Sequence, residues 1–289
     1  MTQLNAKPIT GHTGLLALLG SPVSHSLSPM MHTEAARLLG LDLVYLCFDV
    51  GEENLLTAVA GLKALHVKGF NLTMPNKTKI LSCLDELSPA ARLIGAVNTV
   101  VVDGEKLMGH NTDGAGFVRA LKENGFSPEG KEICLLGAGG AATAITAELA
   151  LLGAGPIHVL FRPESRFAPR MRELSLHIEQ ETGKPLLLSP MEDLPSVLES
   201  SSLLINATNV GMAPGEDASL VDQGLLRPDL FVADVIYNPR QTKLLKEAKA
   251  KGCQTMNGLG MLLYQGAEAF RLWTGEEMPV EAIREKFFT

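Results

Sequence analysis

The stretch of sequence that decides the fold spans residues 133–145 and reads ICLLGAGGAATAI. Its first four residues are typical of a buried strand, and its alanine-rich end is typical of a helix. Gly137, Gly139 and Ala142 have the G-x-G-x-x-(G/A) spacing of a dinucleotide-binding turn. The first glycine permits a tight turn, and the second lets backbone approach a pyrophosphate. Glycines also occur at ordinary strand–helix turns, so the surrounding sequence must decide between the two interpretations.

The helix that follows this turn is expected to bind phosphate at its N-terminus. Its first N–H groups are unpaired, and the positive end of its dipole attracts anions. The residues of the turn that we expect to contact a dinucleotide are Gly137, Ala138, Gly139, Gly140 and Ala141.

Length and composition suggest about two globular domains. The chain has 289 residues, 46% of them hydrophobic and 20% charged, which is enough to bury a sizeable core. A formal charge of −7 argues against nucleic-acid or polybasic membrane-surface binding. No apolar run reaches the ~18 residues of a membrane span, and the N-terminus lacks the pattern of a signal peptide. We therefore expect a cytoplasmic protein.

The cysteines and histidines predict no disulfide and no metal site. Cys47, Cys83, Cys134 and Cys253 are widely scattered, and most of them lie in apolar runs. Buried free thiols are therefore the preferred interpretation. The seven histidines show no spacing that is typical of metal ligands.

Strand-like and helix-like segments alternate along the chain, which predicts an α/β fold with mostly parallel strands. Ser28 is expected to cap a helix that begins at Pro29. A turn at Asp103-Gly104 predicts a hairpin. The expected strands are 14–19, 43–50, 67–72, 97–102, 106–109, 133–136, 157–161, 186–188, 203–207 and 230–235. The expected helices are 29–40, 52–65, 113–124, 170–181, 260–273 and 280–288, with a short one after 77.

The polar loops carry seven further motifs, in a fixed order along the chain. They are SHSLSP at 24–29, NLTMPNK at 71–77, GAVNT at 95–99, NTDG at 111–114, NAT at 206–208, DVIYNP at 234–239 and GLGML at 258–262. Each could occur by chance, but their joint order is specific. On these motifs the chain resembles the shikimate dehydrogenases, in particular the quinate/shikimate dehydrogenase branch, over about residues 14–289.

The resemblance implies two domains with the active site in the cleft between them. We expect a substrate domain at 1–113, completed by 258–289, and a Rossmann-type dinucleotide domain at 114–257. The two C-terminal helices would pack back on the first domain. The implied reaction is reversible hydride transfer between NAD or NADP and the C3 position of shikimate or quinate.

Lys77 and Asp113 match the family's lysine and aspartate beside the reacting hydroxyl. Oxidation of an alcohol needs a group that takes the O–H proton while hydride leaves the carbon. The resemblance implies that Lys77 shuttles this proton and that Asp113 orients the amine and the hydroxyl. The alternatives are a solvated lysine at a helix start and a helix N-cap.

The resemblance also implies the residues that bind the substrate and complete the cofactor site. Ser26 and Ser28 match serines that bind the carboxylate, and Tyr237 matches a tyrosine near it, although Tyr237 could instead be simple packing. The residues that match ring-hydroxyl ligands are Asn71, Thr73, Asn98 and Gln265. Thr208 and Gly258 belong to motifs expected at the cofactor.

The choice of dinucleotide depends on Arg162 and Glu164, which follow the predicted strand 157–161. An arginine there binds the 2′-phosphate of NADP in the family, whereas a carboxylate binds the ribose of NAD and repels a phosphate. We expect NAD to be favoured, with NADP use still open.

Several alternatives stay open at this point. The chain could be another two-domain dehydrogenase, such as a folate-linked one, or a nucleotide sensor without catalysis. Shikimate and quinate are not separated, nor is a role in aromatic amino acid biosynthesis by the shikimate pathway separated from catabolism. A monomer and a homodimer are equally compatible with the sequence.

Overall fold

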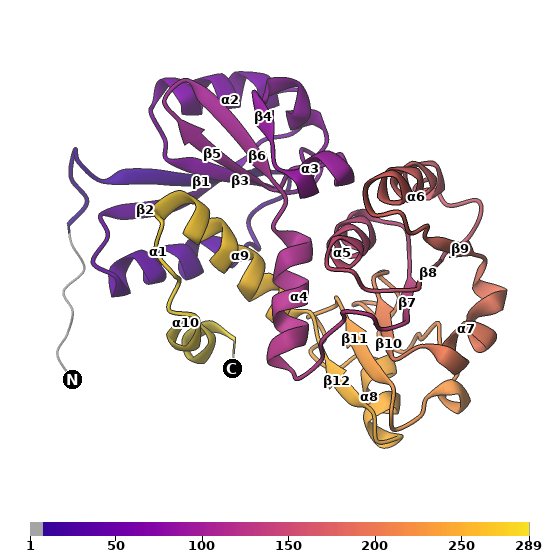
Figure 1. Ribbon diagram of the computed structural model, residues 1–289. Coiled ribbons are helices and arrows are strands. Elements are labelled where there is room, and N and C mark those ends of the chain that lie inside the picture. Colours follow the sequence, from indigo (N-terminus) through magenta and orange to yellow (C-terminus); the bar gives the residue numbers. More distant parts are fainter. Residues whose placement is uncertain (1–7, 289) are drawn as a thin grey trace. The chain divides into compact units, whose positions relative to one another are not determined.

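Two six-stranded sheets organise the chain in the computed structural model, which describes residues 8–288 (Figure 1). The contacts divide it into two units, one of residues up to Thr112 with Gln265 onward, and one of Asp113–Tyr264. The boundaries expected at 113/114 and 257/258 remain a prediction about the domains. The expectation of no signal peptide falls on residues outside those described.

The first unit is a mixed sheet with the strand order β2-β1-β3-β5-β6-β4. Its strands are β1 (Gly14–Gly20), β2 (Leu43–Asp49), β3 (Gly69–Leu72), β4 (Glu86–Leu87), β5 (Thr99–Asp103) and β6 (Lys106–His110). Its helices are α1 (Ser28–Leu38), α2 (Leu55–Ala64), α3 (Pro89–Ile94) and α10 (Val280–Phe287), with a 3-10 turn at Lys79–Cys83. The hairpin predicted at Asp103-Gly104 is confirmed, because β5 and β6 pair antiparallel across it.

Both faces of β1 are buried, which fits its place between β2 and β3 in the sheet. Ala17 and Leu19 pack with α2, whereas Leu16 and Leu18 pack with Trp273 of α9 (Leu259–Thr274). Helix α10 packs on α1, where Lys286 Nζ lies 2.8 Å from Glu34 Oε1. The expected return of the C-terminal helices to the first unit is therefore confirmed.

The second unit is an all-parallel sheet with the order β9-β8-β7-β10-β11-β12. Numbered from its own first strand this is 3-2-1-4-5-6, the Rossmann order. The strands are β7 (Ile133–Leu136), β8 (Ile157–Leu160), β9 (Leu187–Ser189), β10 (Leu203–Asn206), β11 (Phe231–Asp234) and β12 (Gln254–Met256). The helices are α4 (Asp113–Glu123), α5 (Gly140–Leu151), α6 (Ala168–Thr182), α7 (Leu194–Ser200) and α8 (Lys243–Ala250), together with the first residues of α9.

Three smaller expectations have clear outcomes. The four cysteines are free thiols; Cys134 and Cys253 are buried as predicted, whereas Cys47 and Cys83 are only half-buried. Ser28 as a helix cap is wrong: α1 begins at Ser28 itself, and Leu27 is the N-cap without a side-chain bond. Ser28 has joined the helix, and its own N–H donates to Ser26 Oγ at 3.2 Å instead. No helix within residues 8–288 is long and apolar enough to cross a bilayer.

Candidate active site

Strand ends at one edge of the first sheet bring polar residues together. Asn71 lies in β3 opposite Thr99, the first residue of β5, and Thr99 pairs in turn with His110 at the end of β6. The N–H of Leu72 donates to the Asn98 carbonyl at 2.8 Å, and the N–H of Thr73 donates to the Leu19 carbonyl at 3.1 Å. Asn98 is therefore a neighbour of Asn71 and Thr73 at this edge, although it lies about 25 residues further along the chain.

A buried hydrogen-bond network holds the two asparagine side chains. Asn71 Nδ2 donates to the Asn98 carbonyl and to Thr99 Oγ1, both at 2.9 Å. Asn98 Oδ1 accepts from Thr99 Oγ1 and from the N–H of Thr112, both at 2.9 Å. Asn98 Nδ2 donates to Thr112 Oγ1 at 3.0 Å. Their orientations are thus fixed by the protein before any ligand arrives, which is the preorganisation that recognition of hydroxyl groups needs.

Lys77 is held beside this network by its backbone. Its carbonyl accepts from the N–H of Val97 at 2.8 Å, one residue before Asn98. The loop between β3 and Lys77 is fixed by buried Asn76, whose Nδ2 donates to the Val50 carbonyl at 2.8 Å. Lys77 itself is half-buried. A lysine on a rigid loop at this edge can reach a ligand that contacts Asn98.

Asp113 is the first residue of α4 and is half-buried. It follows Thr112 directly, whose N–H and hydroxyl are both bonded to Asn98. The same network that orients Asn98 therefore fixes the backbone immediately before Asp113.

Ser26 and Ser28 lie at the start of α1, near the side chains of β2. Burial raises the pKa of Tyr45 well above its usual range, and the neighbouring Ser28 hydroxyl opposes this rise. Burial likewise raises the pKa of Cys47, and a hydrogen bond with the Ser26 side chain opposes this rise. Both serine hydroxyls are thus placed against alternate side chains of β2.

Gln265 lies in α9 beside Gly266, which allows α9 to approach α1. A Cβ on Gly266 would lie 2.1 Å from Met31 Cε and 3.6 Å from His32 Nε2. This close approach places Gln265, which is half-buried, on the turn of α9 next to α1.

The glycine turn of the second unit has the geometry that the sequence predicts. Gly137 has φ +117°, and a Cβ there would lie 2.9 Å from the Ala207 carbonyl oxygen. Gly139 is the N-cap of α5, and a Cβ on Gly139 or Gly140 would meet nothing within 4 Å. The backbone of this turn is therefore open to a ligand at the N-terminus of α5, beside Ala138 and Ala141.

The other predicted cofactor residues follow neighbouring strands at the same, carboxyl edge. Thr208 follows β10, and its hydroxyl donates to Asn206 Oδ1 at 2.7 Å. Arg162 and Glu164 follow β8 and are exposed. Gly258 donates its N–H to the Ile236 carbonyl at 3.0 Å, and a Cβ there would lie 2.0 Å from the Val235 carbonyl oxygen. Tyr237, 42% exposed, is the next residue after Ile236.

Asp234 received no role in the sequence analysis, yet its hydrogen bonds hold two of these loops. It is fully buried, and burial raises its pKa, although its hydrogen bonds oppose the rise. Its carboxylate accepts from Asn206 Nδ2 at 3.1 Å, from the N–H of Ile236 at 3.0 Å and from Thr242 Oγ1 at 2.7 Å. The available signal was an acidic residue that ends an apolar strand.

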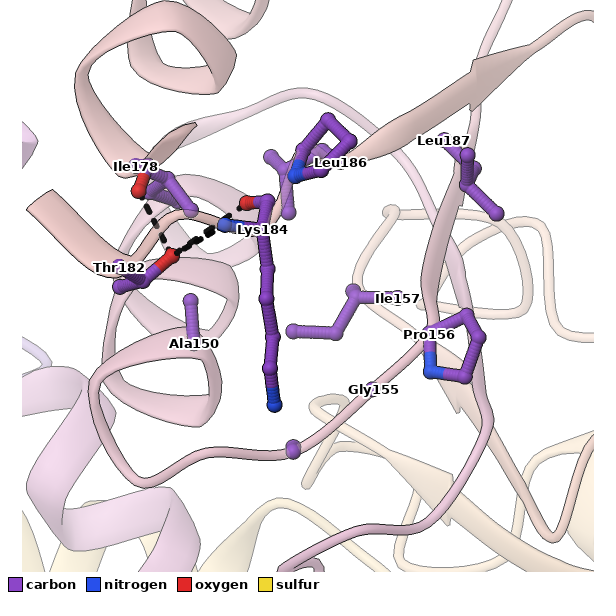
Figure 2. A pocket seen from close by; sticks show the side chains of 11 residues that line it. Ala150, Gly155, Pro156, Ile157, Ile178, Thr182, Lys184, Leu186 and Leu187 are labelled. Carbon is purple, nitrogen blue, oxygen red and sulfur yellow. Dashed lines mark hydrogen bonds between the residues drawn. The ribbon is translucent and has the colours of Figure 1, made fainter. Parts of the chain in front are cut away.

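A pocket of about 330 Å³ in the second unit is not this site (Figure 2). It lies where β8 and β9 begin, at the opposite, amino edge of the sheet. Its lining consists of Ala150, Ala154, Gly155, Pro156, Ile157, Ile178, Thr182, Lys184, Pro185, Leu186 and Leu187. None of the predicted site residues lines it, and its Thr182 hydroxyl is already bonded to the Ile178 carbonyl at 2.7 Å.

Together these features define a class: a two-domain α/β protein whose first unit gathers a lysine, amides and hydroxyls and whose second unit has the Rossmann strand order. Residues 18–100 match the shikimate dehydrogenase substrate-binding domain, and 258–286 match the shikimate 5′-dehydrogenase C-terminal domain. A shikimate dehydrogenase (NADP(+)) of Listeria innocua is 48% identical over the whole of both chains. The chain belongs to the shikimate dehydrogenase family, and the resemblance read from the motifs is confirmed.

Solved structures agree with this assignment. The shikimate 5-dehydrogenase of Listeria monocytogenes, in complex with shikimate and NAD, is 48% identical with a TM-score of 0.94, over 96% of this chain and 98% of that one. The quinate dehydrogenase of Corynebacterium glutamicum, in complex with NAD, is 32% identical with a TM-score of 0.86, over 96% and 99%. The predicted architecture, a substrate-binding domain with a Rossmann domain, is therefore confirmed.

Proposed function

We propose that this protein is a dehydrogenase that transfers hydride reversibly between shikimate or quinate and a nicotinamide dinucleotide. One observation carries the proposal: backbone hydrogen bonds hold Lys77 beside Asn98, at the sheet edge where Asn71 and Thr73 also lie. Its relatives named for this activity are oxidoreductases that act on a CH–OH group. Membership of this family and the chemistry of the site disfavour two alternatives, a folate-linked dehydrogenase and a nucleotide sensor without catalysis.

Lys77 and Asp113 supply the proton chemistry. Lys77 takes the proton of the substrate C3 hydroxyl as the C–O bond becomes a carbonyl, and passes it to solvent. Asp113 orients the amine of Lys77 and the hydroxyl. The bound dinucleotide accepts the hydride from the same carbon. In the reverse direction Lys77 returns a proton to the oxygen of the ketone.

Substrate recognition is assigned to the polar residues of the same sheet edge and to residues that meet the ligand from other loops. Ser26 and Ser28 would bind the carboxylate together with Tyr237. Asn71, Thr73, Asn98 and Gln265 would bind the ring hydroxyls, since hydroxyl and amide groups can both donate and accept.

The phosphates of the dinucleotide would bind at the turn Gly137–Ala141, with Thr208 and Gly258 nearby. Gly139 and Gly140 support this role, because nothing of the protein lies where their Cβ atoms would be. The N-terminus of α5, which begins at Gly140, supplies unpaired N–H groups for the pyrophosphate.

Arg162 and Glu164 would choose between NAD and NADP. The carboxylate of Glu164 favours NAD, because it repels a 2′-phosphate. The name of the Listeria innocua relative specifies NADP(+), which points the other way, whereas the Listeria monocytogenes structure holds NAD. Arg162 offers a phosphate ligand for NADP, so we propose that both dinucleotides are used.

The proposal is tested by steady-state kinetics with shikimate and quinate, each crossed against NAD+ and NADP+. Turnover with at least one pair is expected. Absence of turnover with all four pairs, from protein that is folded by circular dichroism, would refute the function. The cytoplasmic location and the choice between monomer and homodimer remain predictions from the sequence.

A further inference from the structure

Tyr45 is a buried tyrosine whose hydroxyl contacts a residue of the proposed substrate site. It lies in β2, is 2% exposed, and donates from its hydroxyl to Asn71 Oδ1 at 2.7 Å. The two residues are 26 positions apart in the chain. Tyr45 is absent from the set of substrate ligands proposed above, because nothing in its sequence neighbourhood indicates a role.

The ring of Tyr45 is fixed by its neighbours. His32 of α1 stacks on it with a centroid distance of 4.6 Å and an interplanar angle of 11°. Trp273 of α9 lies on the same cluster, with its ring centroid 6.1 Å from that of Tyr45. A ring held by aromatic contacts on more than one side keeps its hydroxyl in one place.

The Asn71 amide has a single possible orientation in this network. Its two Nδ2 hydrogens are used by the Asn98 carbonyl and by Thr99 Oγ1. Thr99 gives its own hydroxyl proton to Asn98 Oδ1. A flipped amide would place Oδ1 against the Asn98 carbonyl oxygen, which cannot donate. The Tyr45 hydroxyl must therefore be the donor to Oδ1.

These hydrogen bonds leave the Asn71 side chain only one way to bind a ligand, as a hydrogen-bond acceptor. Both amide hydrogens are consumed, and one of the two Oδ1 lone pairs accepts from Tyr45. The remaining lone pair can accept a hydrogen bond from a ligand O–H. The raised pKa of Tyr45 keeps its phenol protonated, so the donor is present throughout the ordinary pH range.

We propose that Tyr45 is a positioning residue that presents Asn71 as a pure acceptor to one ring hydroxyl of the substrate. The inference rests on the proposed function. A site built around such an acceptor rejects an analogue that lacks the hydroxyl, because the buried oxygen then loses a partner. Tyr45 thereby contributes to specificity although it touches no substrate atom.

The test compares wild type, Tyr45→Phe, Asn71→Ala and the double variant with shikimate, 4-deoxyshikimate and 5-deoxyshikimate. Tyr45→Phe should raise the KM of shikimate about tenfold, the size expected for a loosened hydrogen bond, with kcat changed less than about twofold. The KM of the dinucleotide should stay unchanged. The preference of the wild type for shikimate over one of the deoxy analogues should fall by a similar factor.

The double variant separates positioning from general packing. If Tyr45 acts through Asn71, adding Tyr45→Phe to Asn71→Ala should leave kcat/KM unchanged within about twofold. Tyr264→Phe is the matched control, because this buried tyrosine donates to Glu123 in the other unit. It should leave the KM of shikimate as in wild type.

The outcomes separate this inference from the proposed function. Wild-type turnover with an unchanged KM and unchanged analogue preference in Tyr45→Phe overturns the role of Tyr45 alone. A lowered melting temperature without a change in KM also overturns it, because that is a packing effect. Absence of wild-type turnover with shikimate and quinate overturns the proposed function, and the inference with it.

Discussion

The N–H of Thr112 donates a 2.9 Å hydrogen bond to Oδ1 of Asn98, across 14 residues of chain. This bond joins the start of β5 to the residue that precedes Asp113, so one amide orients part of the proposed substrate site and the backbone before the proposed partner of Lys77. In the proposed mechanism, recognition and proton transfer therefore depend on the same buried side chain.

Replacement of Asn98 by alanine should impair binding and stability together. The N–H of Thr112 and the hydroxyl of Thr99 would lose their acceptor, at a cost of about 1–3 kcal/mol in the free energy of unfolding. The KM of the substrate should rise at least about tenfold. Urea denaturation and steady-state kinetics check both effects. Asn124→Ala, which removes a bond at the end of α4, is the control and should leave KM as in wild type.

Gly137→Ala should weaken dinucleotide binding. At φ +117° an alanine is strained by about 1–3 kcal/mol, and its Cβ would lie 2.9 Å from the Ala207 carbonyl oxygen. The turn must shift, so the Kd of the dinucleotide by calorimetry should rise at least about tenfold. Gly61→Ala lies in helix α2 with open space around it, and should leave this Kd unchanged. An unchanged Kd in Gly137→Ala would contradict the assigned phosphate turn.

Glu164→Ala should change the ratio of kcat/KM values for NAD+ and NADP+. Glu164 is exposed, and loss of its carboxylate, which we propose lies near the 2′-position, should remove about 1 kcal/mol of repulsion and raise relative activity with NADP+ about fivefold. Glu181→Ala, an exposed residue of the same unit in α6, should leave the ratio alone. In wild type the sequence predicts the higher kcat/KM with NAD+; equal or reversed values would contradict it and agree with the relatives' names.

His32 should make the protein less stable in acid. Burial lowers its pKa from 6.5 to about 3, and neither ring nitrogen has a hydrogen-bond partner among residues 8–288. Below pH 6.5 the unfolded chain binds a proton that the folded protein refuses until about pH 3, so stability falls as pH falls through this window. The effect is about 1.4 kcal/mol per pH unit. His32 therefore lowers the free energy of unfolding by roughly 2–3 kcal/mol between pH 6.5 and 4.5.

The measurement is urea unfolding at pH 6.5 and 4.5 for wild type, His32→Phe and the exposed control His177→Gln. Between pH 6.5 and 4.5 the free energy of unfolding of His32→Phe should fall by roughly 2–3 kcal/mol less than that of wild type. The control should follow wild type. Parallel losses in wild type and His32→Phe would show that His32 is protonated equally in both states.

The Rossmann unit was predictable because its signals are local. A four-residue apolar strand, a glycine turn and an alanine-rich helix follow one another within residues 133–145, and the observed β7, Gly137 and α5 match them. The short elements α7, α8 and β12 had no such signal and were not predicted, since three to eight residues carry too little periodicity to separate helix, strand and loop.

Only the site residues that belong to the family motifs could be predicted from the sequence. Asn71, Lys77 and Asn98 belong to them, but Tyr45 and Thr99 gain their meaning from bonds that reach across strands. Local rules also misled at Ser28, where a serine before proline fits an N-cap, yet the helix starts one residue earlier. Strand pairing, which decides these contacts, is not visible in a single sequence.

The role of Lys77 as proton shuttle is tested most directly by comparing Lys77→Ala with Lys79→Ala, an exposed lysine two residues further on. The measurement is kcat/KM for shikimate- or quinate-dependent reduction of NAD+ or NADP+, with the substrate and cofactor pair that serves wild type best. We predict a loss of about 10²–10⁴-fold in Lys77→Ala and wild-type activity in Lys79→Ala. Equal activity in the two variants would contradict the account.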